Sequence, residues 1–77
     1  MKNTLADLDV GDSGRVKGFA KGNKEYRKKL LAMGLIKGTE LTVKRVAPMG
    51  DPVEINTRGY SLTLRKDEAA TLLVEGA

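Results

Sequence analysis

Alternation of apolar and polar residues on both sides of one tight turn is the feature that most constrains the fold of this chain. The alternation flanks the dipeptide Arg58-Gly59, and its apolar members are Val53, Ile55, Tyr60, Leu62 and Leu64. A period of two places alternate side chains on one face of a strand, and a glycine-containing dipeptide between two such runs is typical of a hairpin. The pattern predicts a half-buried β-hairpin with these five side chains, Tyr60 included, facing the core.

Three further segments have the character of strands: 13–20, 40–47 and 72–75. Gly14 and Gly18 weaken the first as a flat strand but suit a strongly bent one, as at the corner of a small barrel. In the second, the apolar alternation slips by one residue after Val43, which predicts a bulge near Lys44 or Arg45.

The segment Ala47-Pro48-Met49-Gly50 reads as a type I turn between two of these strands. Proline suits the second position of such a turn and glycine the fourth. Pro52 then begins the next strand, where its missing N–H is tolerated.

One segment has the signals of a longer helix, from Lys24 to Met33. Asn23 can cap its first turn, and Gly34 can adopt the left-handed conformation that ends a helix. Leu35 is then expected to pack back on Leu30, as this terminating motif prefers.

Two shorter helical turns are expected elsewhere. Thr4 can cap a turn that runs to Leu8 and stops at Gly11, and residues 66–70 can form another. On the longer helix, Tyr26, Leu30 and Met33 share the spacing of a core stripe.

Together these elements predict a mainly β fold: a small, strongly curved barrel of about five strands, with one α-helix inserted between the first and second strands. An open sheet of this size would leave two long edges unprotected. With 77 residues there is room for a single domain, expected to span 1–77.

Positive charge is concentrated in one part of the chain. Residues 15–45 hold ten cations against Glu25 and Glu40, a local charge of +8 within a chain of net charge +4. Such asymmetry favours an acidic partner such as nucleic acid, an anionic surface or an acidic protein face. The alternative is that the lysines spread around the folded domain and only keep it soluble.

Catalytic and metal-ligand residues are scarce. The chain has no histidine and no cysteine, which removes the usual general base, thiolate chemistry and the preferred ligands of transition metals. We therefore expect no enzyme activity, no catalytic, cofactor or metal site, and no bound cofactor. Absence of cysteine fits a reducing compartment, and no signal peptide or apolar span is found, so a cytoplasmic location without membrane insertion is expected.

Two surfaces are candidates for binding a partner. The first is the helix face with Lys24, Arg27 and Lys28 around Leu31, although a core position for Leu31 is favoured over a partner contact. The second is the turn that presents Met49 and Asp51 at one end of the barrel. For Met49 a second interpretation is open, in which it folds down as a lid on the core.

Several motifs between Tyr26 and Glu75 resemble the FeoA family, small proteins of bacterial ferrous iron uptake. The markers are Leu30-Leu31-Ala32-Met33-Gly34-Leu35, Gly38-Thr39, Ala47-Pro48-Met49-Gly50-Asp51-Pro52, and Arg58-Gly59-Tyr60 followed by Leu64-Arg65. The resemblance implies an SH3-like barrel and a cytoplasmic accessory that binds and modulates a FeoB-type transporter, a membrane protein with a cytosolic GTPase domain. It also implies the family's general association with transition-metal ions.

Two other functions remain as alternatives: a basic barrel that binds nucleic acid, and a metal-sensing SH3-like domain. Nucleic acid is not the expected partner, because single-strand binders need aromatic stacking platforms and two of the three aromatic residues, Tyr26 and Tyr60, lie on expected core stripes. The oligomeric state is open, since exposed barrel edges could pair between copies.

Overall fold

The computed structural model describes residues 4–21 and 24–76 of the chain. Its elements, in chain order, are η1 (Leu5–Asp7), β1 (Ser13–Phe19), α1 (Lys24–Ala32), β2 (Glu40–Val46), η2 (Pro48–Gly50), β3 (Val53–Thr57), β4 (Tyr60–Leu64), α2 (Lys66–Thr71) and β5 (Leu72–Gly76). The mainly β class, the five strands and the helix between the first two are confirmed. The expected helix cap, Asn23, lies outside the described residues.

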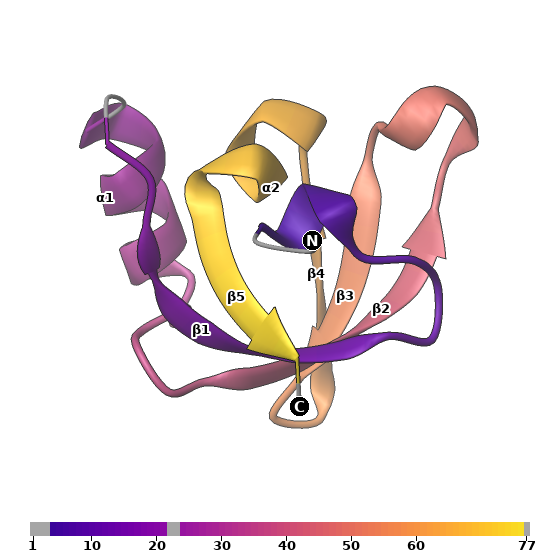
Figure 1. Cartoon of the computed structure of the whole chain (residues 1–77), viewed down its shortest axis with the longest axis horizontal. Helices are drawn as coiled ribbons and strands as arrows, with labels where there is room; N and C mark the ends of the chain where they lie inside the picture. The colour runs from indigo at the N-terminus through magenta and orange to yellow at the C-terminus, as the bar shows by residue number, and fades with distance from the viewer. Residues whose placement is uncertain (1–3, 22–23, 77) are drawn as a thin grey trace.

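All five strands form one antiparallel sheet in the order β4-β3-β2-β1-β5. Figure 1 shows the sheet curling around η1 and α2, with α1 on one side of the molecule and η2 on the opposite side. The pairing of β2 with β3 shifts register between Val43 and Arg45, where the sequence predicts a bulge. A second shift, between Val16 and Gly18 against β5, helps β1 to bend.

The core lies inside this curl and draws on every strand. Its buried members are Leu5, Leu8, Val16, Leu30, Leu35, Leu41, Val43, Val53, Ile55, Leu64, Ala69, Leu72 and Val74. Each fully buried aliphatic side chain contributes roughly 1.5–3 kcal/mol relative to exposure. This burial fixes the curved sheet and, through Leu30 and Leu35, the position of α1.

Helix α1 ends as the sequence predicts. Gly34 has φ 88°, the N–H of Leu35 donates to the C=O of Leu30 at 3.1 Å, and the N–H of Gly34 donates to the C=O of Leu31 at 3.0 Å. These two bonds form the Schellman motif. Leu30 and Leu35 are both fully buried, so the motif turns the chain back onto the core.

The turn between β2 and β3 differs from the predicted type I. The N–H of Gly50 donates to the C=O of Ala47 at 2.9 Å, but Met49 has φ 70°. A type I turn takes a negative φ at its third residue, whereas a positive φ there belongs to a type II turn. The prediction was wrong because a proline at the second position suits both types.

The β3–β4 hairpin has a two-residue connection in which Arg58 and Gly59 both have positive φ, 52° and 85°. These values match a type I′ turn, whose twist suits paired strands. Tyr60 follows this turn and is 44% exposed, so its predicted core position is wrong. The alternating pattern predicts which face of the sheet Tyr60 lies on. It does not predict burial there, because the core does not extend to this end of β4.

Candidate docking surface

A groove lies between the end of β1 and helix α1. It has a volume of about 520 Å³ and is lined by Gly18, Phe19, Ala20, Lys21, Lys24, Arg27 and Lys37. We call these seven residues the basic groove. Four of them are cations and none is a carboxylate, so the potential inside the groove is positive.

Packing of α1 beside β1 builds the floor of the basic groove. Phe19 is partly buried against the core, and the guanidinium carbon of Arg27 lies 5.8 Å from the centroid of the Phe19 ring. This distance is within the range of a cation–π contact. The contact holds the Arg27 side chain over the groove from the helix side.

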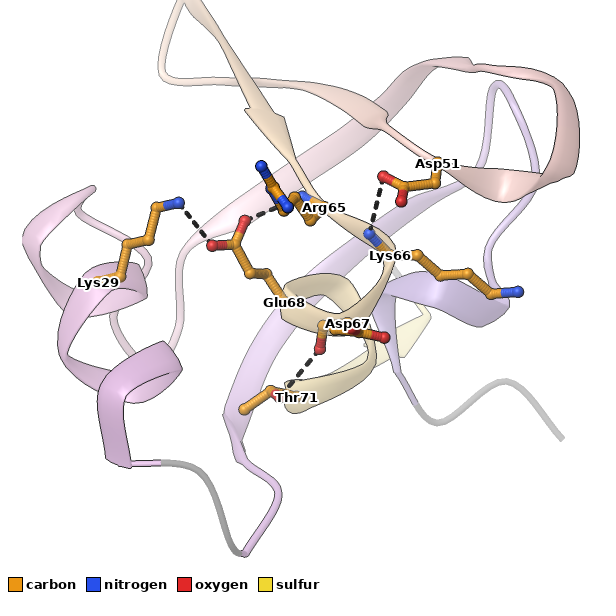
Figure 2. A network of polar contacts seen from close by, with 7 residues as sticks. All are labelled: Lys29, Asp51, Arg65, Lys66, Asp67, Glu68 and Thr71. Atoms are coloured by element: carbon orange, nitrogen blue, oxygen red, sulfur yellow. Dashed lines mark hydrogen bonds and ion pairs between the residues drawn. The ribbon is translucent and has the colours of Figure 1, made fainter.

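An ion pair sets where α1 lies relative to α2. Figure 2 shows Lys29 reaching from α1 to Glu68 on α2, with its Nζ 2.6 Å from Oε2. The second carboxylate oxygen of Glu68 accepts the backbone N–H of Arg65 at 2.9 Å. Glu68 is only 3% exposed. Each of its two buried oxygens thus has a partner inside the protein, as buried polar groups need.

These contacts also decide the charge state of Glu68. Burial acts to raise the pKa of the carboxyl group, but the hydrogen bonds from Lys29 and from the Arg65 backbone outweigh it and leave the pKa below its usual value. Glu68 is therefore ionised at neutral pH, and α1 is held by a charged contact as well as by Leu30.

The outer face of α1 carries the first set of residues singled out from the sequence. Lys24 and Arg27 line the basic groove, while Lys28 is exposed outside its lining. Leu31 is 40% exposed, so the favoured core position was wrong. Leu31 follows the buried Leu30, and a step of one residue turns a side chain about 100° around a helix, which takes it off the core face.

The second set lies on the other side of the molecule. Figure 1 shows α1 and the η2 turn at opposite ends of the view, so Met49 and Asp51 do not join the helix face in one site. Met49 is 93% exposed, which contradicts the interpretation as a lid on the core. Asp51 accepts the backbone N–H of Lys66 at 3.3 Å, and this bond ties the turn to the start of α2.

Sequence reasoning did not select Phe19, Lys21 or Lys37 for the site. Lys21 and Lys37 were counted in the positive stretch 15–45, but nothing in their spacing indicates that they meet. They come together because α1 folds back beside β1. The exposed Ile36, at 46%, was also not selected.

Within 4–21 and 24–76, no group of three or more histidine, cysteine, aspartate or glutamate side chains is arranged to hold a metal ion. In the same ranges, no helix is long and apolar enough to cross a membrane.

Comparison with known proteins identifies relatives of this chain. The sequence model of the FeoA domain matches residues 3–76. A curated relative, the Fe(2+) transport protein A/Fe(2+) transporter FeoB fusion protein of Porphyromonas gingivalis, is 35% identical over 71 residues. That match covers 92% of this chain but only 8% of the fusion protein.

Solved structures agree with this result. The FeoA-like protein of Clostridium acetobutylicum is 38% identical with a TM-score of 0.85, over 99% of this chain and 90% of that protein. The FeoA of Stenotrophomonas maltophilia, solved in complex with zinc and described as a prokaryotic SH3 domain protein, is 25% identical with a TM-score of 0.79, over 94% of this chain and 88% of that one. The predicted SH3-like barrel is thereby confirmed, and the chain belongs to the FeoA domain family.

Proposed function

We propose that this chain is a non-enzymatic, cytoplasmic accessory of ferrous iron uptake that binds a FeoB-type transporter and modulates it. The observation that carries the proposal is the Porphyromonas gingivalis relative, in which a segment like this chain is part of one polypeptide with the transporter FeoB. Fusion keeps two proteins at high effective concentration. Where they are separate chains, a docking surface serves the same purpose.

The structure supports docking rather than chemistry. The barrel is small, 27 × 25 × 25 Å. Two of its hollows are open to the surface: the basic groove, and one lined mostly by polar and charged residues of the strands. We infer that residues 1–77 act as a single domain of this kind. Ferrous iron is the cargo of the transporter and needs no ligand set in the accessory.

Docking is assigned to the residues expected from the sequence. Lys24, Arg27 and Lys28 provide positive charge around Leu31, which is exposed enough to act as an apolar anchor. Met49 and Asp51 provide a second contact on the opposite side, where an exposed methionine adapts to partners of irregular shape. Two separated contacts suit a partner that wraps around the barrel.

The test is co-purification of the tagged chain with its cognate transporter from membranes at low salt, together with ferrous iron uptake by cells that lack the chain. Retention of the transporter and reduced uptake in the deletion strain are expected. If the transporter is not retained and uptake is unchanged in the deletion strain, the proposal is wrong.

Metal sensing is the second class of function, because the Stenotrophomonas maltophilia neighbour was solved with zinc. The described residues do not fit a resident transition-metal ion, since they supply no cluster of three or more ligand side chains. Calorimetry with ferrous iron distinguishes the two: stoichiometric binding with a Kd in the micromolar range would favour the sensor.

A further inference from the structure

We propose that the basic groove binds an acidic segment of a polypeptide in extended conformation. This inference rests on the function proposed above, in that the segment would belong to the transporter partner. The groove itself can be tested without that partner.

Charge is the first argument for an acidic occupant. The four cations come from three separate parts of the chain: Lys21 precedes α1, Lys24 and Arg27 lie on α1, and Lys37 lies between α1 and β2. Like charges brought together around one hollow repel each other, and none of the described residues that line the groove is a carboxylate that could offset them. An occupant with several negative charges removes this repulsion.

The floor of the groove argues for a peptide. Gly18, Phe19 and Ala20 have no polar side-chain atoms, so an apolar side chain can rest on them while carboxylates reach the cations at the rim. In an extended peptide, residues i and i+2 project to the same face about 7 Å apart. A segment that alternates acidic and apolar residues therefore matches the rim and the floor together.

The packing of the Phe19 ring argues against single-stranded nucleic acid as the occupant. Nucleic acid binders of this size use exposed aromatic faces on which bases stack. Here the ring packs against the core, and Arg27 lies over its face. A base would first have to displace that contact.

One side of β1 is left unpaired next to the groove. β1 pairs with β2 only from Ser13 to Arg15, and Val16 then bonds to Gly38 and Thr39 in the loop after α1. Within the described ranges, no residue pairs with β1 beyond Val16 on the side away from β5. That is the side on which Lys37, the neighbour of Gly38, lines the groove.

Phe19 is the residue whose peptide groups face this open side. The N–H of Ala20 donates to the C=O of Thr71 at 2.8 Å, toward the β5 side. Bonding direction alternates along an antiparallel ladder, so the N–H and C=O of Phe19 point the opposite way. Pairing with them would add a short strand to the sheet edge, a common mode of peptide recognition.

The experiment uses a fluorescein-labelled peptide of alternating glutamate and valine, with fluorescence anisotropy measured over a series of salt concentrations. The variant is the triple substitution Lys24→Gln, Arg27→Gln, Lys37→Gln. Its matched control, Lys44→Gln, Arg45→Gln, Lys66→Gln, removes the same charge from exposed positions outside the groove. Thermal unfolding checks that both variants fold.

We expect the peptide to bind the parent chain, with affinity that falls as salt is raised. The groove variant should lose about tenfold or more in affinity, because three charge contacts are removed, whereas the control should lose less than about threefold. A peptide N-methylated on its backbone amides should also bind less tightly. Equal losses in the two variants, or no binding by the parent chain, would overturn the proposal.

Two further arms separate the remaining outcomes. A single-stranded RNA oligonucleotide that binds more tightly than the peptide, and through the same residues, would overturn the acidic peptide as occupant. Co-purification of the groove variant with the transporter distinguishes the two proposals. If the groove variant retains the transporter as well as the parent chain does, the groove assignment fails and the proposed function stands. If the peptide binds the groove but the parent chain retains no transporter and its deletion leaves iron uptake unchanged, the proposed function fails and the groove assignment stands.

Discussion

The ammonium group of Lys29 lies 2.6 Å from the carboxylate of Glu68, and this contact joins α1 to α2 (Figure 2). The two partners differ in environment, since the Lys29 side chain is 55% exposed and the Glu68 side chain only 3%. Loss of the lysine therefore leaves a buried carboxylate with only its backbone contact. Loss of the glutamate would instead leave an ammonium group that water can still solvate.

Lys29→Met should lower the free energy of unfolding by about 1–3 kcal/mol, because a buried acceptor loses its charged partner. Urea unfolding measures the change. Lys28→Met, the same substitution one residue earlier on the exposed face, should stay within about 0.5 kcal/mol. Equal effects of the two substitutions would show that the ion pair does not stabilise the fold.

Acid should remove the contribution of Glu68. The pKa of this carboxyl group is lower in the folded protein than its ordinary value of 4.5, so its stabilising effect is complete above that value and is lost as pH falls through the lower, folded pKa. The difference in unfolding free energy between the parent chain and Glu68→Gln should thus shrink below about pH 4.5. A difference that stays constant from neutral to acid pH would contradict the assignment.

Leu31→Ala should leave stability nearly unchanged while weakening association with the transporter. Leu31 is 40% exposed, whereas the adjacent Leu30 is fully buried. The matched substitution Leu30→Ala should cost roughly 2–5 kcal/mol. We would measure thermal unfolding of both variants and their co-purification with the transporter. A large fall in melting temperature for Leu31→Ala would show that Leu31 belongs to the core and is not an anchor for the partner.

Gly34→Ala should destabilise the chain by more than about 1 kcal/mol. Gly34 has φ +88°, and a Cβ built on it would lie 3.4 Å from the hydroxyl of Tyr60. An alanine is strained at this φ. Gly18→Ala is the control, since a Cβ there meets nothing within 4 Å and its φ is not positive. Measured by denaturant unfolding, this control should be neutral or slightly stabilising. A loss of stability as large as that of Gly34→Ala would show that the positive φ of Gly34 is not the cause.

Features that depend on neighbouring residues were predictable from the sequence. The Schellman end of α1 needs only Leu30, Gly34 and Leu35, and the bulge after Val43 follows from one slipped position in an alternating run. The hairpin, the helix and the order of the elements along the chain follow for the same reason. Each is set by backbone preference and apolar period over a few residues.

Burial at the ends of elements could not be predicted in this way. Tyr60 and Leu31 were both expected in the core, yet Tyr60 lies beyond the end of the core and Leu31 lies off the core face of a helix. For Met49, the interpretation as a lid on the core was likewise wrong. Its positive φ belongs to the turn between β2 and β3 and was also not predicted. Periodicity gives the face of a residue, but the extent of the core depends on what packs there.

Sequence alone determined the family, the SH3-like barrel and the excess of positive charge between residues 15 and 45. Only the tertiary structure decided which cations share a site. Lys21, Lys24, Arg27 and Lys37 line one groove because burial of Leu30 and Leu35 in the core and the ion pair from Lys29 to Glu68 on α2 fix the position of α1. Those contacts join residues far apart in the chain, and no local pattern encodes where they meet.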